Sequence, residues 1–187
     1  MKVKHLVGAF LCVLGCYACS SPKTEVQSPD GHIKMTLTVD ENGKPFYNVS
    51  VDDSLLIENS AMGFTAANGI ILGEGFQVKN TTFSSEDETW TQPWGENKKN
   101  RNHYNEMAVN LTNEDHVQLT LRFRVFDDGI GFRYEYTVPT VDSLLITDEL
   151  TTFRFHRDGT SWSIPASAET YELLYQQQPI SEVETAN

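Results

Sequence analysis

The stretch RFRVFDDGIGFRYEYTV, residues 122–138, decides the fold class. Apolar and polar side chains alternate on both sides of its Asp127-Asp128-Gly129 segment, and a period of two is the spacing of a half-buried β-strand. An Asp-Gly pair between two such runs is a strong hairpin signal, because glycine takes the positive φ that a tight turn requires. The sequence therefore predicts two antiparallel strands joined at this segment.

The two faces of the predicted hairpin differ in chemistry. Aromatic and branched side chains fall on the face that we expect to point into a core: Phe123, Val125, Phe132, Tyr134 and Tyr136. Charged side chains fall on the other face: Arg122, Arg124, Arg133 and Glu135. These arginines have two interpretations, either as clamps for a ligand or as a solvated or second-sheet face on which opposite charges pair across strands.

The rest of the chain repeats this pattern. Alternating runs separated by turns rich in Gly, Asn and Asp cover residues 32–39, 46–53, 54–60, 107–113, 116–129, 130–138, 143–156 and 160–165. No stretch of helical length has its apolar residues at helical spacing, and only residues 167–182 are ambiguous. Short strands between frequent turns are typical of antiparallel sandwiches and barrels. The predicted fold class is all-β, an antiparallel β-sandwich.

The composition indicates one acidic domain. The chain has 187 residues, of which 39% are hydrophobic and 21% charged, as in ordinary globular proteins. Its formal net charge is -12. That charge repels a phosphate backbone, so we expect no nucleic acid partner. It is compatible with neutral sugars and with a hard cation.

The first residues, MKVKHLVGAFLCVLGCYACSS, have the pattern of an exported protein. Lys2 and Lys4 precede an apolar run that is too short to span a bilayer, as in a secretory signal peptide. VLGC, ending at Cys16, resembles the lipobox of bacterial lipoproteins, and YAC, ending at Cys19, is the alternative lipidation site. A plain signal peptide with incidental cysteines also stays open. We expect a periplasmic protein or a lipoprotein anchored to the membrane.

This interpretation divides the chain into three parts. Residues 1–21 are the signal peptide, residues 22–31 a polar tether and residues 32–187 the sandwich domain. All three cysteines (Cys12, Cys16 and Cys19) lie in the first part. The domain is therefore expected to have no disulfide, no thiol nucleophile and no cysteine metal site.

The segment TWTQPWGENKKNRNHYNEMAV, residues 89–109, is too polar for a buried strand and too aromatic for an ordinary loop. One interpretation is a substrate-binding platform on which Trp90, Trp94 and Tyr104 stack against sugar rings. The other is a packed corner of the sandwich, in which the proline and glycine interrupt a strand and the two tryptophans fill the corner. We expect the corner.

The residues show no catalytic motif. The five histidines have no HxH or HExxH spacing, so the sequence does not support a zinc site. Neither GxSxG nor a glycine-rich phosphate loop is present. Glycosidase chemistry needs two carboxylates that flank a bond, whereas the acidic runs 86–88 and 127–128 are interpreted as an exposed loop and a turn. We expect no catalysis from this chain alone.

Four motifs, in order along the chain, resemble the N-terminal domain of glycoside hydrolase family 97: WTQPWGENKKNRNHYNEMAV, RFRVFDDGIGFRYEY, DELTTFRF and SWSIP. The opening SPDGHIKMTLTVDENGKPFYNVSVDD is similar to the beginning of that domain, so the resemblance covers nearly all of residues 26–175. Family members are exported Bacteroidetes enzymes that act on α-glucosides or α-galactosides. The resemblance implies a β-super-sandwich followed by a catalytic (β/α)8 barrel and a C-terminal β-domain. Because the family's sandwich continues past residue 187, we expect an incomplete C-terminal end.

The resemblance also implies one metal-binding residue. In the family, a glutamate shortly after the SWSIP motif reaches from the sandwich into the active site and helps to bind calcium. Glu172 falls on that position, and Glu169 is the nearest alternative. One glutamate supplies at most two of the oxygen ligands that calcium needs. We therefore expect calcium to bind only when a catalytic barrel is present. Two alternatives stay open: the chain packs on a barrel in trans, or it is a truncated product or fragment of a longer enzyme.

Two functions stay open. The first is a non-catalytic domain of a family 97 α-glycosidase, whose carbohydrate is an α-glucan or an α-galactoside. The second is an independent lipid-anchored module that binds carbohydrate through exposed aromatic rings or has a structural role. In the second case Glu172 is a surface carboxylate.

Overall fold

The computed structural model describes residues 23–139, 141–165 and 172–183. The predicted signal peptide with its cysteines lies outside this part, as does Glu169. Nearly all regular structure in the described part is β-strand, so the all-β prediction is confirmed. None of its helices is long and apolar enough to span a membrane.

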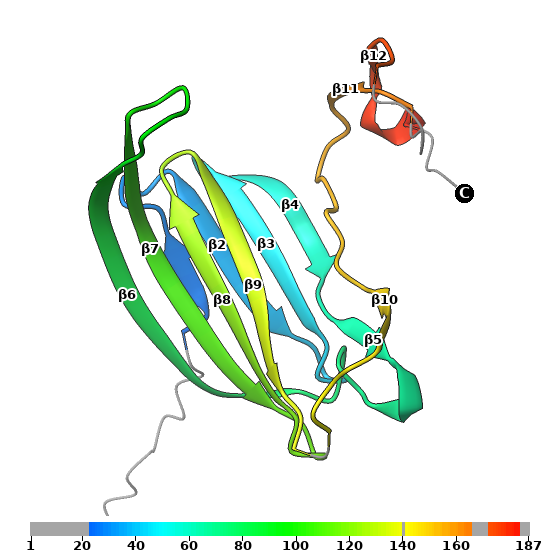
Figure 1. Ribbon diagram of the computed structural model, residues 1–187. Helices are drawn as coiled ribbons and strands as arrows, with labels where there is room; N and C mark the ends of the chain where they lie inside the picture. The colour runs from blue at the N-terminus through cyan, green and yellow to red at the C-terminus, as the bar shows by residue number, and fades with distance from the viewer. Residues whose placement is uncertain (1–22, 140, 166–171, 184–187) are drawn as a thin grey trace, which may run out of the picture.

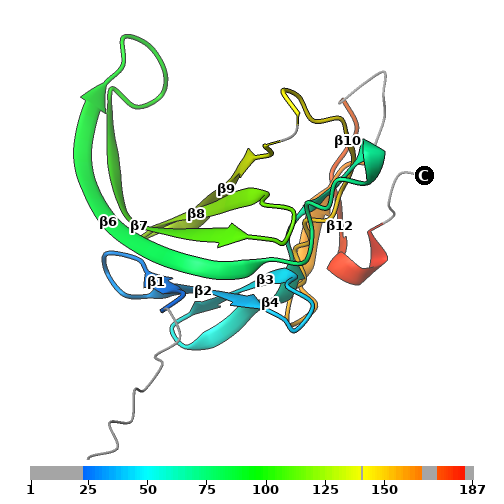
Figure 2. The same ribbon diagram turned by 90° about the horizontal axis from the view of Figure 1, so that it is seen from below.

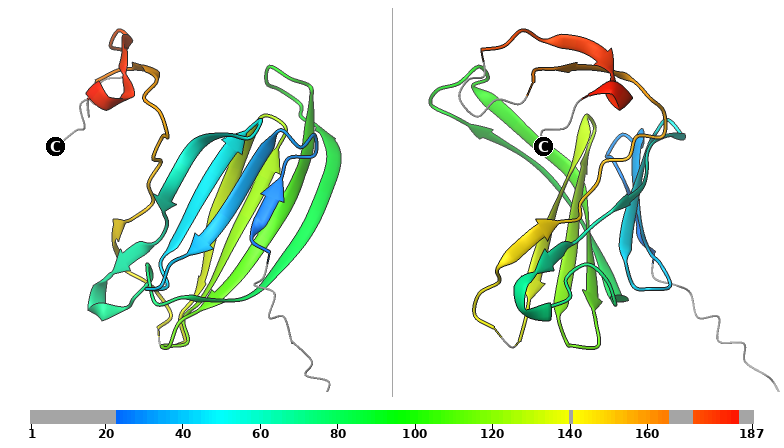
Figure 3. Two further views of the ribbon diagram at one scale, coloured as in Figure 1. Left: turned by 180° about the vertical axis from the view of Figure 1, so that it is seen from behind. Right: turned by 90° about the vertical axis from the view of Figure 1, so that its right-hand side faces the viewer.

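Two four-stranded antiparallel sheets form the body of the protein (Figure 1). The first sheet has the order β1 (Glu25–Gln27), β2 (Ile33–Val39), β3 (Pro45–Val51) and β4 (Ser54–Ala61). The second has the order β6 (Gln77–Thr91), β7 (Lys99–Thr112), β8 (Gln118–Phe126) and β9 (Gly129–Thr137). The side view in Figure 3 shows the two sheets as two layers, which is the predicted sandwich.

The hairpin expected at residues 122–138 is present, but its turn differs from the expectation. Phe126 pairs with Gly129, so the turn consists of the two aspartates between them. Gly129 begins β9 and its φ is not positive, so the role predicted for this glycine is wrong. A turn with two positive φ values joins β3 to β4 instead, at Asp52 (48°) and Asp53 (60°). Aspartate tolerates this conformation, and its twist matches that of a hairpin.

Alternate residues of the two sheets meet in the core. β2 and β3 bury Ile33, Met35, Leu37, Tyr47 and Val49 from one side. β7 and β8 bury Met107, Val109, Leu111, Leu119, Leu121, Phe123 and Val125 from the other. The rings of Phe132, Tyr134 and Tyr136 on β9 pack against this cluster, so the core face predicted for the hairpin is confirmed. Each fully buried side chain of this kind contributes about 1.5–3 kcal/mol to folding.

β6 and β7 extend beyond the sandwich as a two-stranded finger, residues 87–103 (Figure 2). Their pairing continues as far as Thr91 opposite Lys99, whereas β8 pairs with β7 only up to Tyr104. The break expected from the proline and glycine in this segment is therefore the tip of a hairpin. The acidic run 86–88 belongs to a strand and not to a loop.

β1 brings the expected tether into the sandwich. It pairs with β2, and Val26 is only 6% exposed, so the domain begins before residue 32. β1 is also the edge of the first sheet, and it lies against β7. The first sheet therefore ends over β7, and β6 lies beyond that edge.

The chain after β9 runs along the edge of β4 (Figure 1). Backbone hydrogen bonds join Thr152 N to Ala61 O, Glu58 N to Arg154 O and His156 N to Leu56 O. Of the strand predicted over residues 143–156, only a short part is regular. The remaining elements are β5 (Phe64–Ala66), η1 (Ala67–Gly69), β10 (Ile146–Glu149), β11 (Thr160–Ser163), β12 (Gln176–Pro179) and η2 (Ile180–Glu182), with β10 paired to β5 and β11 to β12.

Candidate functional site

The finger carries two exposed tryptophans. Trp94 is 84% exposed near the tip, and Trp90 is 50% exposed on β6. The expectation that they fill a packed corner is therefore wrong, because most residues of the finger are open to solvent. Tyr104, at the root of the finger, is 7% exposed, and its ring lies 5.3 Å from that of Phe126 and 4.4 Å from the guanidinium of Arg124. Little of the Tyr104 ring remains for a ligand, so sugar stacking rests on the two tryptophans.

Polar contacts hold the shape of the finger. Arg101 Nε and Nη2 each donate to the carboxylate of Asp87 at 2.8 Å. The hydrogen bond from Arg101 lowers the pKa of Asp87. At the tip, Gln92 Nε2 donates to the main-chain oxygen of Asn97 at 2.9 Å, and Gly95 has a φ of 123°. Because the Arg101–Asp87 pair is exposed, it fixes geometry more than it adds stability.

Glu172 lies between β11 and β12, where it is exposed. Among the residues that the structure describes, no group of three or more His, Cys, Asp and Glu side chains is arranged to hold a metal ion. Calcium needs six to eight oxygen ligands in most sites. A calcium ion coordinated through Glu172 would therefore take most of its ligands from outside the described residues.

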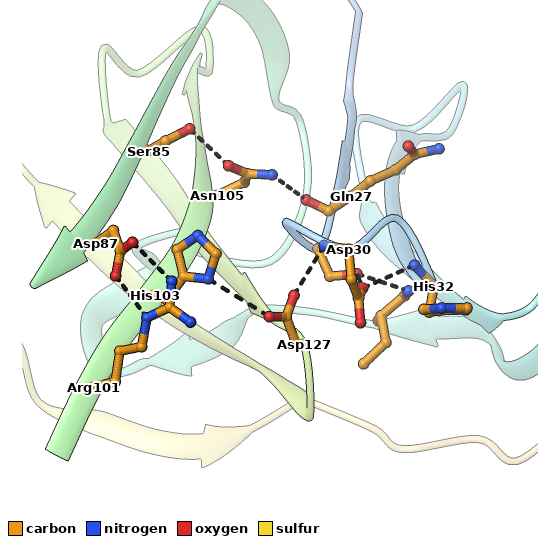
Figure 4. Close-up of polar contacts among 11 residues, drawn as sticks. Gln27, Asp30, His32, Ser85, Asp87, Arg101, His103, Asn105 and Asp127 are labelled. Atoms are coloured by element: carbon orange, nitrogen blue, oxygen red, sulfur yellow. Dashed lines mark hydrogen bonds and ion pairs between the residues drawn. The ribbon is translucent and has the colours of Figure 1, made fainter.

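An open cleft lies between residues 23–31 and the β6–β7 pair. Its volume is about 670 Å³, and Phe83, Ser85 and Asn105 line the side formed by β6 and β7. Ser85 Oγ donates to Asn105 Oδ1 at 2.6 Å, and Asn105 Nδ2 donates to the main-chain oxygen of Gln27 at 2.9 Å (Figure 4). Phe83 is 51% exposed. The cleft combines fixed amide and hydroxyl groups with one open aromatic ring.

The aspartates near this cleft hold turns together (Figure 4). Asp127 Oδ1 accepts from Asp30 N at 3.0 Å, which fastens the loop before β2 to the β8–β9 turn. Asp30 Oδ1 accepts from Ser28 Oγ at 2.5 Å and from His32 N at 3.0 Å. These two hydrogen bonds, that of Ser28 first, lower the pKa of Asp30. His103 Nδ1 lies 3.6 Å from Asp127 Oδ2, which is too far for a hydrogen bond.

An ion-pair network covers the outer face of β7, β8 and β9. Glu106 accepts from Arg122 Nη1 at 2.6 Å and from Arg124 Nε at 2.7 Å. Glu135 accepts from Arg122 Nε at 2.9 Å and from Arg133 Nε at 2.7 Å. Of the two interpretations of these arginines, the structure favours a face of cross-strand pairs, because glutamates already occupy the guanidinium groups that a ligand would use.

The pKa values of the two glutamates follow from this geometry. Burial acts to raise the pKa of Glu106, but the hydrogen bonds from Arg124 and Arg122 outweigh it, so the pKa is lowered. The hydrogen bond from Arg122 is the largest cause that lowers the pKa of Glu135 to about 2. Both carboxylates are therefore charged at neutral pH, and each is balanced by arginines.

One protein family matches the chain over nearly its whole length. Residues 26–187 match the family described as glycosyl-hydrolase 97 N-terminal. The chain belongs to this family. The resemblance seen in the four sequence motifs is thus confirmed over more of the chain than the motifs themselves cover.

Relatives of this family 97 N-terminal domain are much longer proteins. The retaining alpha-galactosidase of Bacteroides thetaiotaomicron is 29% identical over 133 residues, which are 71% of this chain and 19% of that protein. A glycoside hydrolase family 97 enzyme from Pseudoalteromonas sp. strain K8, solved with panose, is 34% identical with a TM-score of 0.76, over 84% of this chain and 25% of that one. A beta-arabinopyranosidase structure is 25% identical with a TM-score of 0.71, over 81% of this chain and 26% of that one. The chain spans 19% to 26% of the length of these relatives.

Sequence reasoning missed the cleft of the family 97 domain. The sequence feature that could have indicated this cleft is the stretch TTFSSEDET, residues 81–89, in which Phe83 is the only large apolar side chain. A strand with a single aromatic residue among hydroxyl and acidic ones has no continuous core face. Such a strand is expected to leave that residue near water, at the margin of a sheet.

Proposed function

We propose that this family 97 domain acts as the non-catalytic N-terminal sandwich of an α-glycosidase and packs on a catalytic (β/α)8 barrel. The observation that carries the proposal is the family match over residues 26–187, together with solved family 97 enzymes of which the chain covers about a quarter. Substrates are α-glucosides or α-galactosides. This class agrees with the names of the relatives, a retaining alpha-galactosidase and an enzyme solved with panose.

Within that assembly, Glu172 contributes to a calcium site completed by the barrel. Its exposure and its place after the SWSIP motif support this role, since a bridging ligand must reach a second domain. The carboxylate supplies one or two oxygens, and carboxylates of the barrel supply others. The calcium ion would supply positive charge at the active site, while the sandwich holds one of its ligands in place.

The test combines the purified protein with the catalytic barrel of the Bacteroides thetaiotaomicron relative, made without its own N-terminal domain. Hydrolysis of p-nitrophenyl α-galactoside is measured with calcium and with a chelator. We expect the sandwich to raise turnover in a calcium-dependent way, and Glu172→Gln to abolish that gain. Glu182→Gln, at an exposed glutamate in η2, is the matched control and should keep it. Turnover by the sandwich alone, or equal effects of the two variants, would contradict the proposal.

A second candidate is an independent lipid-anchored module that binds carbohydrate. The exposure of Trp90 and Trp94 favours it, because open indole faces are available to sugar rings. Titration with maltooligosaccharides should then change the tryptophan fluorescence, and Trp94→Ala should weaken binding. Unchanged affinity in that variant would remove the stacking role.

The anchor itself has its own test. Expression of the full chain in a bacterial host with labelled palmitate should label the protein and place it in the membrane fraction. Cys16→Ala should remove the label if Cys16 is the lipidated residue, and Cys19→Ala should leave it. Labelling that is lost only with Cys19→Ala would assign the alternative cysteine, and an unlabelled chain would contradict the lipoprotein proposal.

A further inference from the structure

We propose that the cleft between β1 and β6 is a binding site for a neutral oligosaccharide. Phe83 is the ring on which a sugar lies, and Ser85 and Asn105 are the groups that hydrogen-bond its hydroxyls. The proposal does not depend on the calcium role of Glu172. It also uses other residues than the tryptophans of the finger, so the two sugar-binding ideas can be told apart.

The position of the first sheet explains why Phe83 is open. Phe83 pairs with Met107 on β7, so both side chains point to the same side of the second sheet. Met107 is fully buried, because the first sheet covers β7. Since that sheet ends at β1, Phe83 on β6 keeps 51% of its surface exposed. The fold thus places a large aromatic ring beside the core without covering it.

The polar groups of the cleft are fixed and still have hydrogen-bonding capacity. The Asn105 amide can make two donor and two acceptor bonds. It uses one donor on Gln27 O and one acceptor on Ser85 Oγ, which leaves one of each for a ligand. The Ser85 hydroxyl donates its proton to Asn105 and keeps acceptor capacity. Groups that are held in this way lose little conformational entropy when a ligand binds.

The chemistry of the cleft points to a neutral sugar. Among the described residues of the lining, the charged side chains on the β1 side are Lys23, Glu25 and Asp30, so carboxylates outnumber cations and a phosphate group is disfavoured. Glu106 also borders the cleft, but its carboxylate is on the outer face of the sheet with Arg122 and Arg124. Within the part of the chain that the structure describes, Phe83 is the only aromatic residue in the lining, which is too little apolar surface for a lipid chain. A neutral sugar fits both the aromatic ring and the polar groups of the cleft, because its C–H face can cover the ring while its hydroxyls donate and accept hydrogen bonds. The volume of about 670 Å³ is within the usual range of ligand sites.

The experiment follows backbone amide signals of the ¹⁵N-labelled protein by NMR during titration with maltotriose and, separately, with melibiose. We expect saturable shifts at Gln27, Phe83, Ser85 and Asn105 with at least one of the sugars, at concentrations up to about 20 mM, the range of weak binding. Phe83→Ala should raise Kd about five- to tenfold, since a sugar would cover the exposed half of the ring.

Two further variants make the outcome decisive. Ser85→Ala, at an exposed position, removes one hydrogen-bonding group and should weaken binding about threefold, which gives a second test if Phe83→Ala perturbs the fold. Trp162→Ala, at an aromatic residue that is 64% exposed on β11, is the control and should leave Kd unchanged. Saturable shifts confined to the finger, a loss of affinity only in Trp94→Ala, or no saturable shifts with either sugar would overturn the proposal.

Discussion

Replacing Glu106 with glutamine tests the ion-pair network on the outer face of β7 to β9. The side chain of Glu106 is 10% exposed and accepts hydrogen bonds from Arg122 and Arg124. Glutamine keeps the shape and can still accept from one arginine, but it presents an N–H group to the other. The loss is one charge-assisted hydrogen bond, about 1.5–3 kcal/mol. For a chain of this size it should lower Tm by roughly 4–10 °C.

Urea denaturation followed by circular dichroism is the assay, because urea, unlike guanidinium, does not screen charges. Glu135→Gln is the control. The Glu135 side chain is 36% exposed, so solvent screening should reduce its effect to about 1 kcal/mol or less.

The pH dependence separates charge from packing. The pKa of Glu106 is lower in the folded state than the unfolded value of 4.5. Its contribution is therefore present above pH 4.5 and disappears as pH falls through the folded-state pKa. The difference in the free energy of unfolding between the protein and the Glu106→Gln variant should therefore shrink over the same pH range. Equal stability at neutral pH, or a difference that persists unchanged in acid, would refute this account.

Three other outcomes follow from the structure. The hydrogen bond that His32 Nδ1 donates to Asp52 raises the pKa of His32 above 6.5. The stabilisation from this pair is therefore complete below pH 6.5 and is lost as pH rises through the folded-state pKa, so His32→Gln should lower Tm in mild acid and leave Tm unchanged at about pH 9. Gly43 has a φ of 74°, and a Cβ there would lie 2.3 Å from a backbone nitrogen. Gly31 also has a positive φ, but nothing lies within 4 Å of a Cβ there, so Gly31→Ala should cost only the ~1–2 kcal/mol of left-handed strain. In urea titrations, Gly43→Ala should therefore lower the free energy of unfolding by well over that amount. Trp94→Ala should change the free energy of unfolding by less than about 0.5 kcal/mol, because Trp94 is 84% exposed.

The sandwich could be predicted from the sequence because its strands have one buried face. Phe123 and Val125 alternate with Arg122 and Arg124, and this local pattern records which side meets the other sheet. The finger could not be predicted in this way, since both of its faces meet water and its strands show no apolar alternation. For the segment after residue 149, the sequence predicted a strand where the structure has little regular pairing. It has the composition of a strand, but it pairs with β4 only at intervals.

The cleft was beyond sequence reasoning for a different reason. Phe83 is exposed only because a sheet that begins 58 residues earlier, at Glu25, ends over β7 and not over β6. That offset between two sheets depends on long-range packing, which no local pattern around residue 83 records. The fixed amide of Asn105 likewise depends on the main-chain oxygen of Gln27, which is 78 residues away in sequence.

The finger adds exposed side chains to the surface of the protein but does not take part in packing the core. Among the described residues, the hydrophobic core takes no member from residues 87–103. Substitutions there can change size, charge or aromatic content at almost no cost to folding, so selection for a new contact can act on this segment alone.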